Sequence, residues 1–198
     1  TALIAERNVT RSERDRAVVA ESAAEAVNQF LVGELLASST PAASQGRDLT
    51  VREVLDRAAV TADRAFPGQP LLAASVRTTL ARSYLRLGRM DAAAQNHDIA
   101  SSLLASQHDA AHPARLAVEF LGAEIHLDSG HYAQAAQQLD ALIERQSASM
   151  GETHLDTLRS QTLRARVHLS LADWDRAEKL VHRVLSQLAT KRPDATDE

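Results

Sequence analysis

The chain contains eight histidines, and histidine is the residue type in it with the clearest chemical potential. His108 and His112 have the spacing of the two zinc ligands in a His-Glu-x-x-His protease motif, where both imidazoles lie on one helix face. Asp109 stands where the catalytic glutamate would be, and the segment is predicted to be a loop between helices. We therefore expect His108 and His112 to be loop and helix-start residues rather than metal ligands.

Other signatures of catalysis are absent from the sequence. There is no cysteine, which excludes thiolate nucleophiles, cysteine-ligated zinc and disulfides. There is no Gly-x-Ser-x-Gly or phosphate-binding Gly-x-x-x-x-Gly-Lys run, and no Gly-rich, His-Arg-Asp or Asp-Phe-Gly kinase motif. His126 and His168 are predicted to be half-buried packing residues. We expect no catalytic residue, no metal and no cofactor in this chain, and an all-α enzyme is the least favoured class of function.

The charge balance also limits the classes of partner. The chain has 22 basic and 26 acidic residues, so its net charge is 22 − 26 = −4. This balance argues against nucleic acid, because binding to a phosphate backbone needs a basic surface. No window approaches the 18 or so apolar residues of a membrane span, so we expect no membrane contact by these residues. The sequence starts at Thr1 rather than at Met, which suggests a piece of a longer protein.

A step of 42 residues relates many positions along the chain. Gly88 and Gly130 are separated by this step, and Ala172 follows one step later. The same step relates further triplets: Ala81, Ala123 and Ala165; Leu85, Leu127 and Leu169; Met90, Tyr132 and Trp174; Ala93, Ala135 and Ala177. So many series in one register indicate an internal repeat.

Each repeat is predicted to be a pair of helices joined by a short turn. The first helices are expected over 70–87, 112–129 and 154–171, and the second over 90–106, 132–148 and 174–189. Alanine, with 37 residues, allows the helices of a pair to approach closely, and Trp174 and its register mates should pack against the core. Such pairs bury their apolar faces by stacking, which predicts an all-α, right-handed α-solenoid of about four pairs.

The predicted organisation has three parts. Residues 1–69 form an N-terminal stalk helix and a diverged capping helix pair, of which the second helix opens at the capping box Thr50-Val51-Arg52-Glu53 and runs to about Phe66. This first pair is atypical. Three repeats follow over 70–111, 112–153 and 154–190, and 191–198 is predicted to be a flexible tail.

The repeats resemble the tetratricopeptide repeat. That family's pattern of a large residue, Leu-Gly, Tyr, Ala and an aromatic falls on Arg77, Leu80-Ala81, Tyr84, Ala93 and His97. The 42-residue period and the run Gly151-Glu152-Thr153-His154-Leu155-Asp156-Thr157-Leu158 look more like the kinesin-light-chain type of the repeat. Leu155 departs from this type, which usually has proline there, whereas His112-Pro113 keeps the pair. The resemblance implies a right-handed solenoid that binds proteins or peptides.

The front of the chain carries a second resemblance. Glu13-Arg14-Asp15-Arg16-Ala17, Phe30-Leu31-Val32 and Thr50-Val51-Arg52-Glu53-Val54-Leu55-Asp56-Arg57 are similar to a segment of bacterial transmembrane Ser/Thr protein kinases. In those proteins the segment follows the membrane helix and leads into repeats. The resemblance implies a membrane helix before Thr1, a kinase domain elsewhere in the full-length protein, and an extracytoplasmic, periplasmic location for these residues. Without it the location is unknown.

The repeat resemblance also implies a binding surface, because in this family the first helices line a concave groove. Carrying that over by register predicts a peptide- or protein-binding groove at seven positions: Arg82, Arg86, Phe120, Glu124, Asp128, Arg159 and Arg166. Arginine clusters can clamp carboxylates through two parallel hydrogen bonds. Two alternatives stay open at this point: these charges form an ordinary solvated face, or Phe120 belongs to the core.

Two functions remain in competition. The first is the sensory or scaffolding C-terminal region of a membrane-anchored bacterial Ser/Thr kinase that acts in signal transduction. The alternative is a repeat adaptor, or the tail of a transcriptional or signalling regulator, with no kinase domain. The ligand is not identified by the sequence, and a homodimer is left open.

Overall fold

The computed structural model describes residues 25, 28–30, 32–33, 50–105 and 110–190, and within these ranges every regular element is an α-helix. The helices are α3 (Val51–Ala65), α4 (Pro70–Arg86), α5 (Met90–Ala105), α6 (Pro113–Asp128), α7 (Tyr132–Met150), α8 (Leu155–Ser170) and α9 (Trp174–Thr190). None of the described helices is long and apolar enough to span a bilayer.

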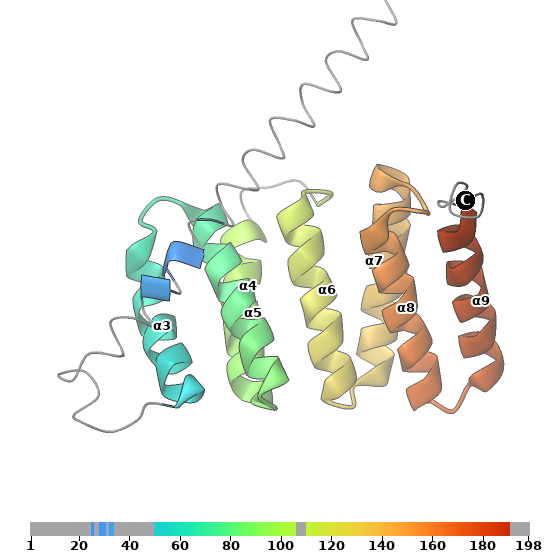
Figure 1. The fold of residues 1–198 in the computed structure, drawn as a ribbon, viewed down its shortest axis with the longest axis horizontal. Helices are drawn as coiled ribbons and strands as arrows, with labels where there is room; N and C mark the ends of the chain where they lie inside the picture. The colour runs from blue at the N-terminus through green and yellow to red at the C-terminus, as the bar shows by residue number, and fades with distance from the viewer. Residues whose placement is uncertain (1–24, 26–27, 31, 34–49, 106–109, 191–198) are drawn as a thin grey trace, which may run out of the picture.

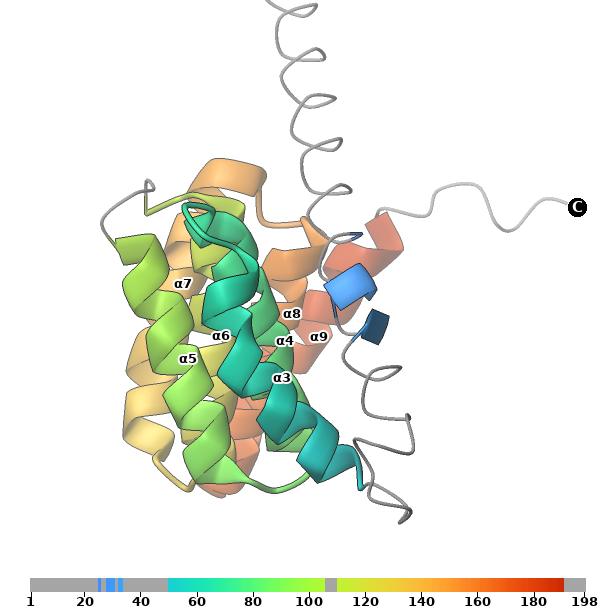
Figure 2. The ribbon, with the colours of Figure 1, turned by 90° about the vertical axis from the view of Figure 1, so that its left-hand side faces the viewer.

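The helices stack in two layers, with α4, α6 and α8 in one and α5 and α7 in the other. Figure 1 shows the stack from α3 at one end to α9 at the other, with α4 overlapping α5 and α8 overlapping α7, and Figure 2 looks along the stack from the α3 end. Each helix packs on the next in the chain, and α4, α6 and α8 also contact one another in that order. This arrangement confirms the predicted all-α solenoid. The six repeat helices begin within one residue of their expected positions.

The turns inside the three helix pairs have the same geometry. Gly88, Gly130 and Ala172 have φ of 69°, 79° and 57°, in the left-handed region that favours glycine. The amide after each of them donates to the carbonyl five residues earlier, as in Arg89 N to Tyr84 O at 2.9 Å. This pattern ends a helix and satisfies its last carbonyls.

The core lies where small residues let neighbouring helices meet. Ala81, Ala123 and Ala165 of the first helices are fully or almost fully buried, and so are their partners on the second helices, Ala93, Ala135 and Ala177. Larger side chains fill the space between pairs. One cluster joins Leu139 and Leu142 of α7 to Leu163 and Val167 of α8. The stack is therefore continuous through the repeats.

The front of the solenoid is closed by α3. The predicted capping box is present, since Glu53 N donates to the Thr50 hydroxyl and Thr50 N donates to the Glu53 carboxylate. Arg77 of α4 is 4% exposed and bonds both Asp63 of α3 and Asn96 of α5, at 2.7 and 2.9 Å. Phe30 packs edge-on against Phe66. The rest of the predicted stalk helix, and the tail 191–198, lie outside the described residues.

The expected packing of Trp174 against the core is wrong. Its side chain is 64% exposed, whereas its register mate Tyr132 is half-buried against the cluster of α6, α7 and α8. Tyr132 is covered because α8 follows α7. Among the described helices α9 is the last and packs on α8, so nothing that the structure describes covers the side of α9 that carries Trp174.

Candidate binding groove

Two histidines, His112 and His154, cap the N-termini of first helices. The Nδ1 atoms of His112 and His154 accept hydrogen bonds from the amides two residues later, at 3.3 and 3.2 Å, at the starts of α6 and α8. His126 is half-buried and His168 is 9% exposed, so both are packed in the helix pairs as expected. His108 lies outside the described residues. Within the described ranges no three His, Asp or Glu side chains are grouped in a way that could hold a metal ion.

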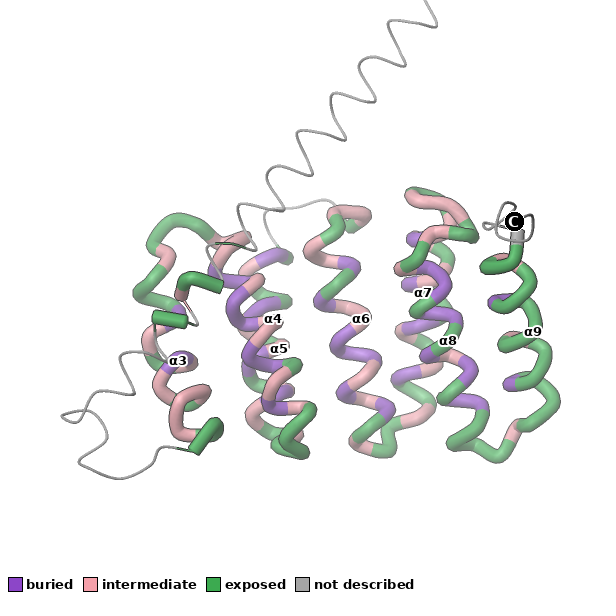
Figure 3. The backbone as a smooth tube through the Cα atoms, in the orientation of Figure 1, coloured by how far each residue is buried: buried purple, intermediate pink, exposed green. Residues whose placement is uncertain are grey.

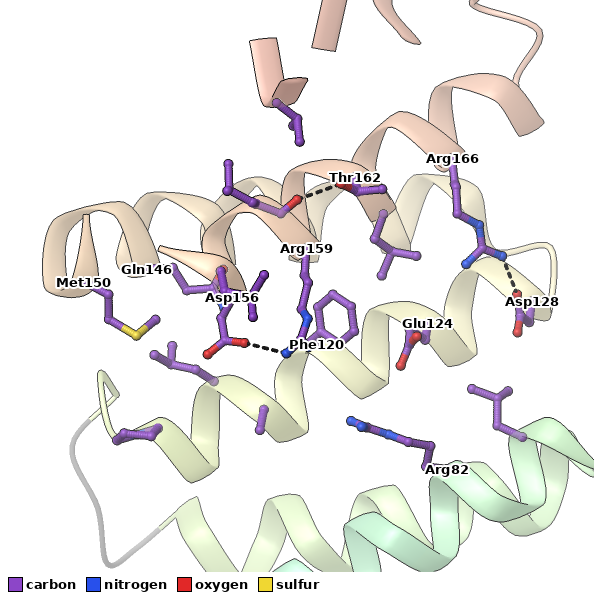
Figure 4. A pocket seen from close by; sticks show the side chains of 18 of the residues that line it. Arg82, Phe120, Glu124, Asp128, Gln146, Met150, Asp156, Arg159, Thr162 and Arg166 are labelled. Atoms are coloured by element: carbon purple, nitrogen blue, oxygen red, sulfur yellow. Dashed lines mark hydrogen bonds and ion pairs between the residues drawn. The ribbon is translucent and has the colours of Figure 1, made fainter. Parts of the chain in front are cut away.

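The first helices α4, α6 and α8 line a groove of about 740 Å³. Leu116, Leu158 and Leu163 are buried residues that contribute to its floor. Charged side chains stand on its walls, and Figure 4 shows them converging from α4, α6 and α8 around a central Phe120. The groove therefore combines an apolar floor with charged sides, which are the surfaces that a peptide with mixed side chains requires.

All seven positions predicted from the register line this one groove. They are Arg82 and Arg86 on α4; Phe120, Glu124 and Asp128 on α6; and Arg159 and Arg166 on α8. Spacings of four and seven residues put the members on each helix on a single face. The structure thus brings the seven residues together, and their role in binding stays a prediction.

Phe120 belongs to both the core and the groove. Its half-buried ring packs against the hydrophobic cluster that includes Leu116, Leu163 and Val167. The exposed part of the ring lines the groove. The core therefore holds the ring in place, and a ligand meets a rigid apolar surface.

The arginines on the two sides of the groove differ in their ion pairing. On α8, Arg159 pairs with Asp156 at 3.1 Å, and Arg166 pairs with Asp128 at 3.6 Å. On α4, Arg82 and Arg86 are exposed, and neither has a carboxylate oxygen within 4.0 Å among the described residues. The α4 side therefore offers two guanidinium groups to an incoming anion, whereas the α8 side is largely neutralised.

Glu124 stands between these two sides. Burial raises the pKa of its carboxyl group, and nearby Asp128 raises it further, while Arg82 in particular lowers it. Figure 4 shows Arg82 reaching from α4 toward the part of the groove where Phe120 and Glu124 lie. The ionised carboxylate is thus an internal counter-charge for Arg82, although no direct hydrogen bond joins the two within the described residues.

Several groove residues were not predicted from the sequence. Gln146 and Met150 come from the end of α7, and Val184 and Leu188 come from α9. Gln146 is 2% exposed, and its carboxamide oxygen has no hydrogen-bond partner among the described residues. The register argument considered first helices only, so it could not find side chains that second helices contribute. To find these side chains, the sequence would have had to predict how far the ends of α7 and α9 reach toward the groove between the first helices.

No family model and no curated protein matches the chain. Two similar solved structures are crystal structures of a Podosopora anserina protein described as a kinesin light chain with nearly identical TPR-like repeats, one of them of a variant with a single substitution. The structure of the variant is 18% identical with a TM-score of 0.53 and covers 93% of each chain. The other is 18% identical with a TM-score of 0.53 and covers 94% of this chain and 95% of that chain. These likenesses support a tetratricopeptide-like solenoid and extend to the fold alone.

Proposed function

We propose that the groove binds an extended segment of a partner protein, in which one or two carboxylates lie next to an apolar side chain. The observation that carries the proposal is the pair of exposed arginines on α4, Arg82 and Arg86, without an ion-pair partner within 4.0 Å among the described residues, beside the fixed ring of Phe120. A carboxylate gains charge-assisted hydrogen bonds from such guanidinium groups. An apolar side chain gains from burial against the ring and the leucine floor.

The ion pairs in the groove indicate which side receives the acidic residues of the ligand. Asp128 and Asp156 would repel a carboxylate placed near Arg166 or Arg159, and the existing pairs would have to open. On the α4 side no ion pair within 4.0 Å has to open among the described residues, and the counter-charge there, Glu124, is a half-buried carboxyl whose burial raises its pKa. We therefore assign the acidic residues of the ligand to the α4 side and its apolar residues to the space between α6 and α8.

For the full-length protein, we propose the sensory or scaffolding C-terminal region of a membrane-anchored bacterial Ser/Thr kinase. Support for this finer proposal is the resemblance of the front segment, in particular Glu13–Ala17 and Thr50–Arg57. The test is the coding sequence upstream of Thr1. A membrane span preceded by His-Arg-Asp and Asp-Phe-Gly motifs would support the kinase, and an upstream sequence without them would support the alternative.

That alternative is a repeat adaptor or regulator tail with no kinase domain. The likeness to the solved repeat structures covers 93% or more of this chain and extends to the fold alone, and a repeat array of this fold is equally compatible with an adaptor. Both proposals use the groove in the same way, so the groove experiment tests a feature that they share.

The groove experiment uses labelled decapeptides and fluorescence anisotropy. One peptide places two glutamates before a leucine and a phenylalanine, and a matched peptide replaces both glutamates with lysine. We expect binding of the acidic peptide only, with an affinity that falls as salt rises, because exposed charges are screened over about 10 Å at 0.1 M salt. Equal binding of both peptides, or of neither, would contradict the proposal.

A double variant assigns the binding to the α4 side. Arg82→Gln with Arg86→Gln should abolish binding of the acidic peptide and change the melting temperature little, because both side chains are exposed and no carboxylate is added beside Glu124. The matched control is Arg183→Gln on α9, an exposed arginine that does not line the groove. Loss of binding in the control to the same degree would indicate a general charge effect rather than a site.

A further inference from the structure

The last described helix exposes a line of large apolar side chains. Trp174, Val181, Leu185 and Leu188 of α9 are 64%, 41%, 56% and 42% exposed. Their spacings of seven, four and three residues put all four along one side of the helix. Figure 3 shows α9 at the end of the stack with most of its length exposed. We call these four residues the α9 stripe.

In the preceding repeat, the helix face that is equivalent to the α9 stripe is covered by a neighbouring helix. One 42-residue step before the α9 stripe stand Tyr132, Leu139, Ile143 and Gln146 of α7. None of these four is exposed: Leu139 and Gln146 are buried, and Tyr132 and Ile143 are half-buried. They lie where α7 packs against α8, in a cluster that contains Leu163 and Val167 of α8. The α9 stripe is therefore the surface on which a repeat unit receives another amphipathic helix.

We propose that the α9 stripe is covered by the α9 helix of a second copy of this chain, in an antiparallel pair related by a two-fold axis near Val181. The stripe is self-complementary in this arrangement. Trp174 and Leu188 are each seven residues from Val181, so the axis puts Trp174 of one copy on Leu188 of the other. Both stripes are then covered at once, and the assembly closes as a dimer.

The charges beside the stripe fit the same register. Glu178 and His182 border it on the solvent side, are 73% and 74% exposed at their side chains, and lie 3.7 Å apart within one helix. In the antiparallel pair, Glu178 of one copy comes within about one helical turn of His182 of the other. The arrangement therefore puts each Glu178 carboxylate beside a His182 imidazole of the other copy, with opposite charges when the imidazole is protonated, whereas a parallel pair would put each glutamate against a glutamate.

The chain has a single tryptophan, Trp174, and it reports directly on this interface. The experiment measures sedimentation velocity and tryptophan emission of the whole chain between about 1 µM and about 100 µM. We expect the mass to rise from 21.4 kDa to twice that value, and the emission to move to shorter wavelength over the same concentrations. A chain that stays monomeric, with unshifted emission throughout, would overturn the proposal and would point to a helix of another protein as the occupant.

The first set of variants tests whether the dimer interface lies on the α9 stripe. Leu185→Glu should weaken self-association about tenfold or more while the helix content is kept, since Leu185 is exposed in the single chain. The matched control is Val60→Glu, which changes a 71% exposed apolar residue of α3 and should leave the dimer intact. Equal effects of the two substitutions would overturn the placement on α9.

A charge exchange tests the antiparallel register without removing an apolar group. Glu178→Arg should weaken the dimer, because an arginine then stands where each His182 had a carboxylate opposite it. Addition of His182→Glu should restore the affinity, since the opposite pairs are rebuilt with their signs reversed. A charge exchange without effect would overturn the register. None of these substitutions changes a residue that lines the groove, although Leu188 belongs to both the stripe and the groove. Peptide binding is therefore measured at about 1 µM chain, so that the groove proposal is tested on the monomer.

Discussion

The Tyr84 phenol of α4 donates a hydrogen bond of 2.6 Å to the carboxylate of Asp56 on α3. Tyr84 is 2% exposed, and its burial, together with this bond, raises the pKa of the phenol well above its usual value. The bond ties the helix that precedes the repeats to the first repeat. It gives α3 a specific place on the solenoid, in addition to the apolar contacts of Ala58 and Ala62.

This bond should be measurable as a coupling between the two residues. Asp56→Ala leaves a buried hydroxyl without its partner and should cost about 1–3 kcal/mol of unfolding free energy. Tyr84→Phe should cost about 1 kcal/mol, because the exposed Asp56 carboxylate can return to water. Urea unfolding of both single variants and the double variant checks this. Strictly additive losses would mean that the bond contributes nothing.

Ala135 provides a test of the close approach between α6, α7 and α8. It is fully buried in the cluster with Leu163 and Val167, so Ala135→Leu should overpack the contact and cost about 1–3 kcal/mol. The matched control is Ala133→Leu, two residues away on the exposed side of α7. Denaturant midpoints of the two variants should therefore differ. Equal midpoints would show that the register of α7 is misplaced.

Tyr132 and Trp174 occupy the same repeat position and should respond differently to truncation. Tyr132→Ala removes a half-buried ring from the core cluster and should cost about 2–4 kcal/mol. Trp174→Ala should change the stability of the single chain by no more than about 0.5 kcal/mol, because the indole is exposed. The comparison is made at low protein concentration, where self-association does not contribute. A larger loss at Trp174 would contradict the exposure of its side chain.

Ala172 is strained in its turn, whereas the equivalent positions of the other two repeats, Gly88 and Gly130, carry glycine. Its φ of 57° lies in the left-handed region, which costs an L-residue about 1–2 kcal/mol. Ala172→Gly should therefore raise the stability by about 0.5–1 kcal/mol, after the entropy cost of glycine is subtracted. Gly88→Ala and Gly130→Ala should both lower the stability, since their φ values are 69° and 79°. A loss of stability in Ala172→Gly would rule out strain at this turn.

Glu124 should make the stability depend on pH in a defined direction. Because burial raises the pKa of its carboxyl group, the folded protein binds this proton more tightly than the unfolded chain does. The stabilising contribution is thus complete below the ordinary pKa of 4.5 and is lost as pH rises through the raised value. Glu124→Gln should be more stable than the unmodified protein near pH 7, and the difference should shrink toward pH 4. Urea unfolding midpoints of both proteins between pH 4 and pH 7 measure this difference. A stability advantage of Glu124→Gln that grows as pH falls would contradict the raised pKa of Glu124.

Local interactions explain why much of the fold could be predicted from the sequence. The helix ends at Gly88, Gly130 and Ala172, and the start at Thr50-Glu53, depend on residues within one turn of each other. The 42-residue step then puts equivalent residues on equivalent faces, which is why all seven predicted positions line one groove. The proposed binding role of these residues depends on a resemblance and is still to be tested.

Contacts between helices decided the remaining features. The sequence predicts the same packing for Trp174 as for Tyr132, but burial needs a neighbouring helix, and the described structure has one beside α7 and none on that side of α9. The pairing of Arg166 with Asp128 joins α8 to α6 across 38 residues. Among the described residues no carboxylate oxygen lies within 4.0 Å of Arg82, which depends on the same spatial arrangement. A repeat pattern determines which face of a helix a residue occupies. Only the tertiary structure determines which side chain stands opposite, because that depends on the spacing and curvature of the stacked helices.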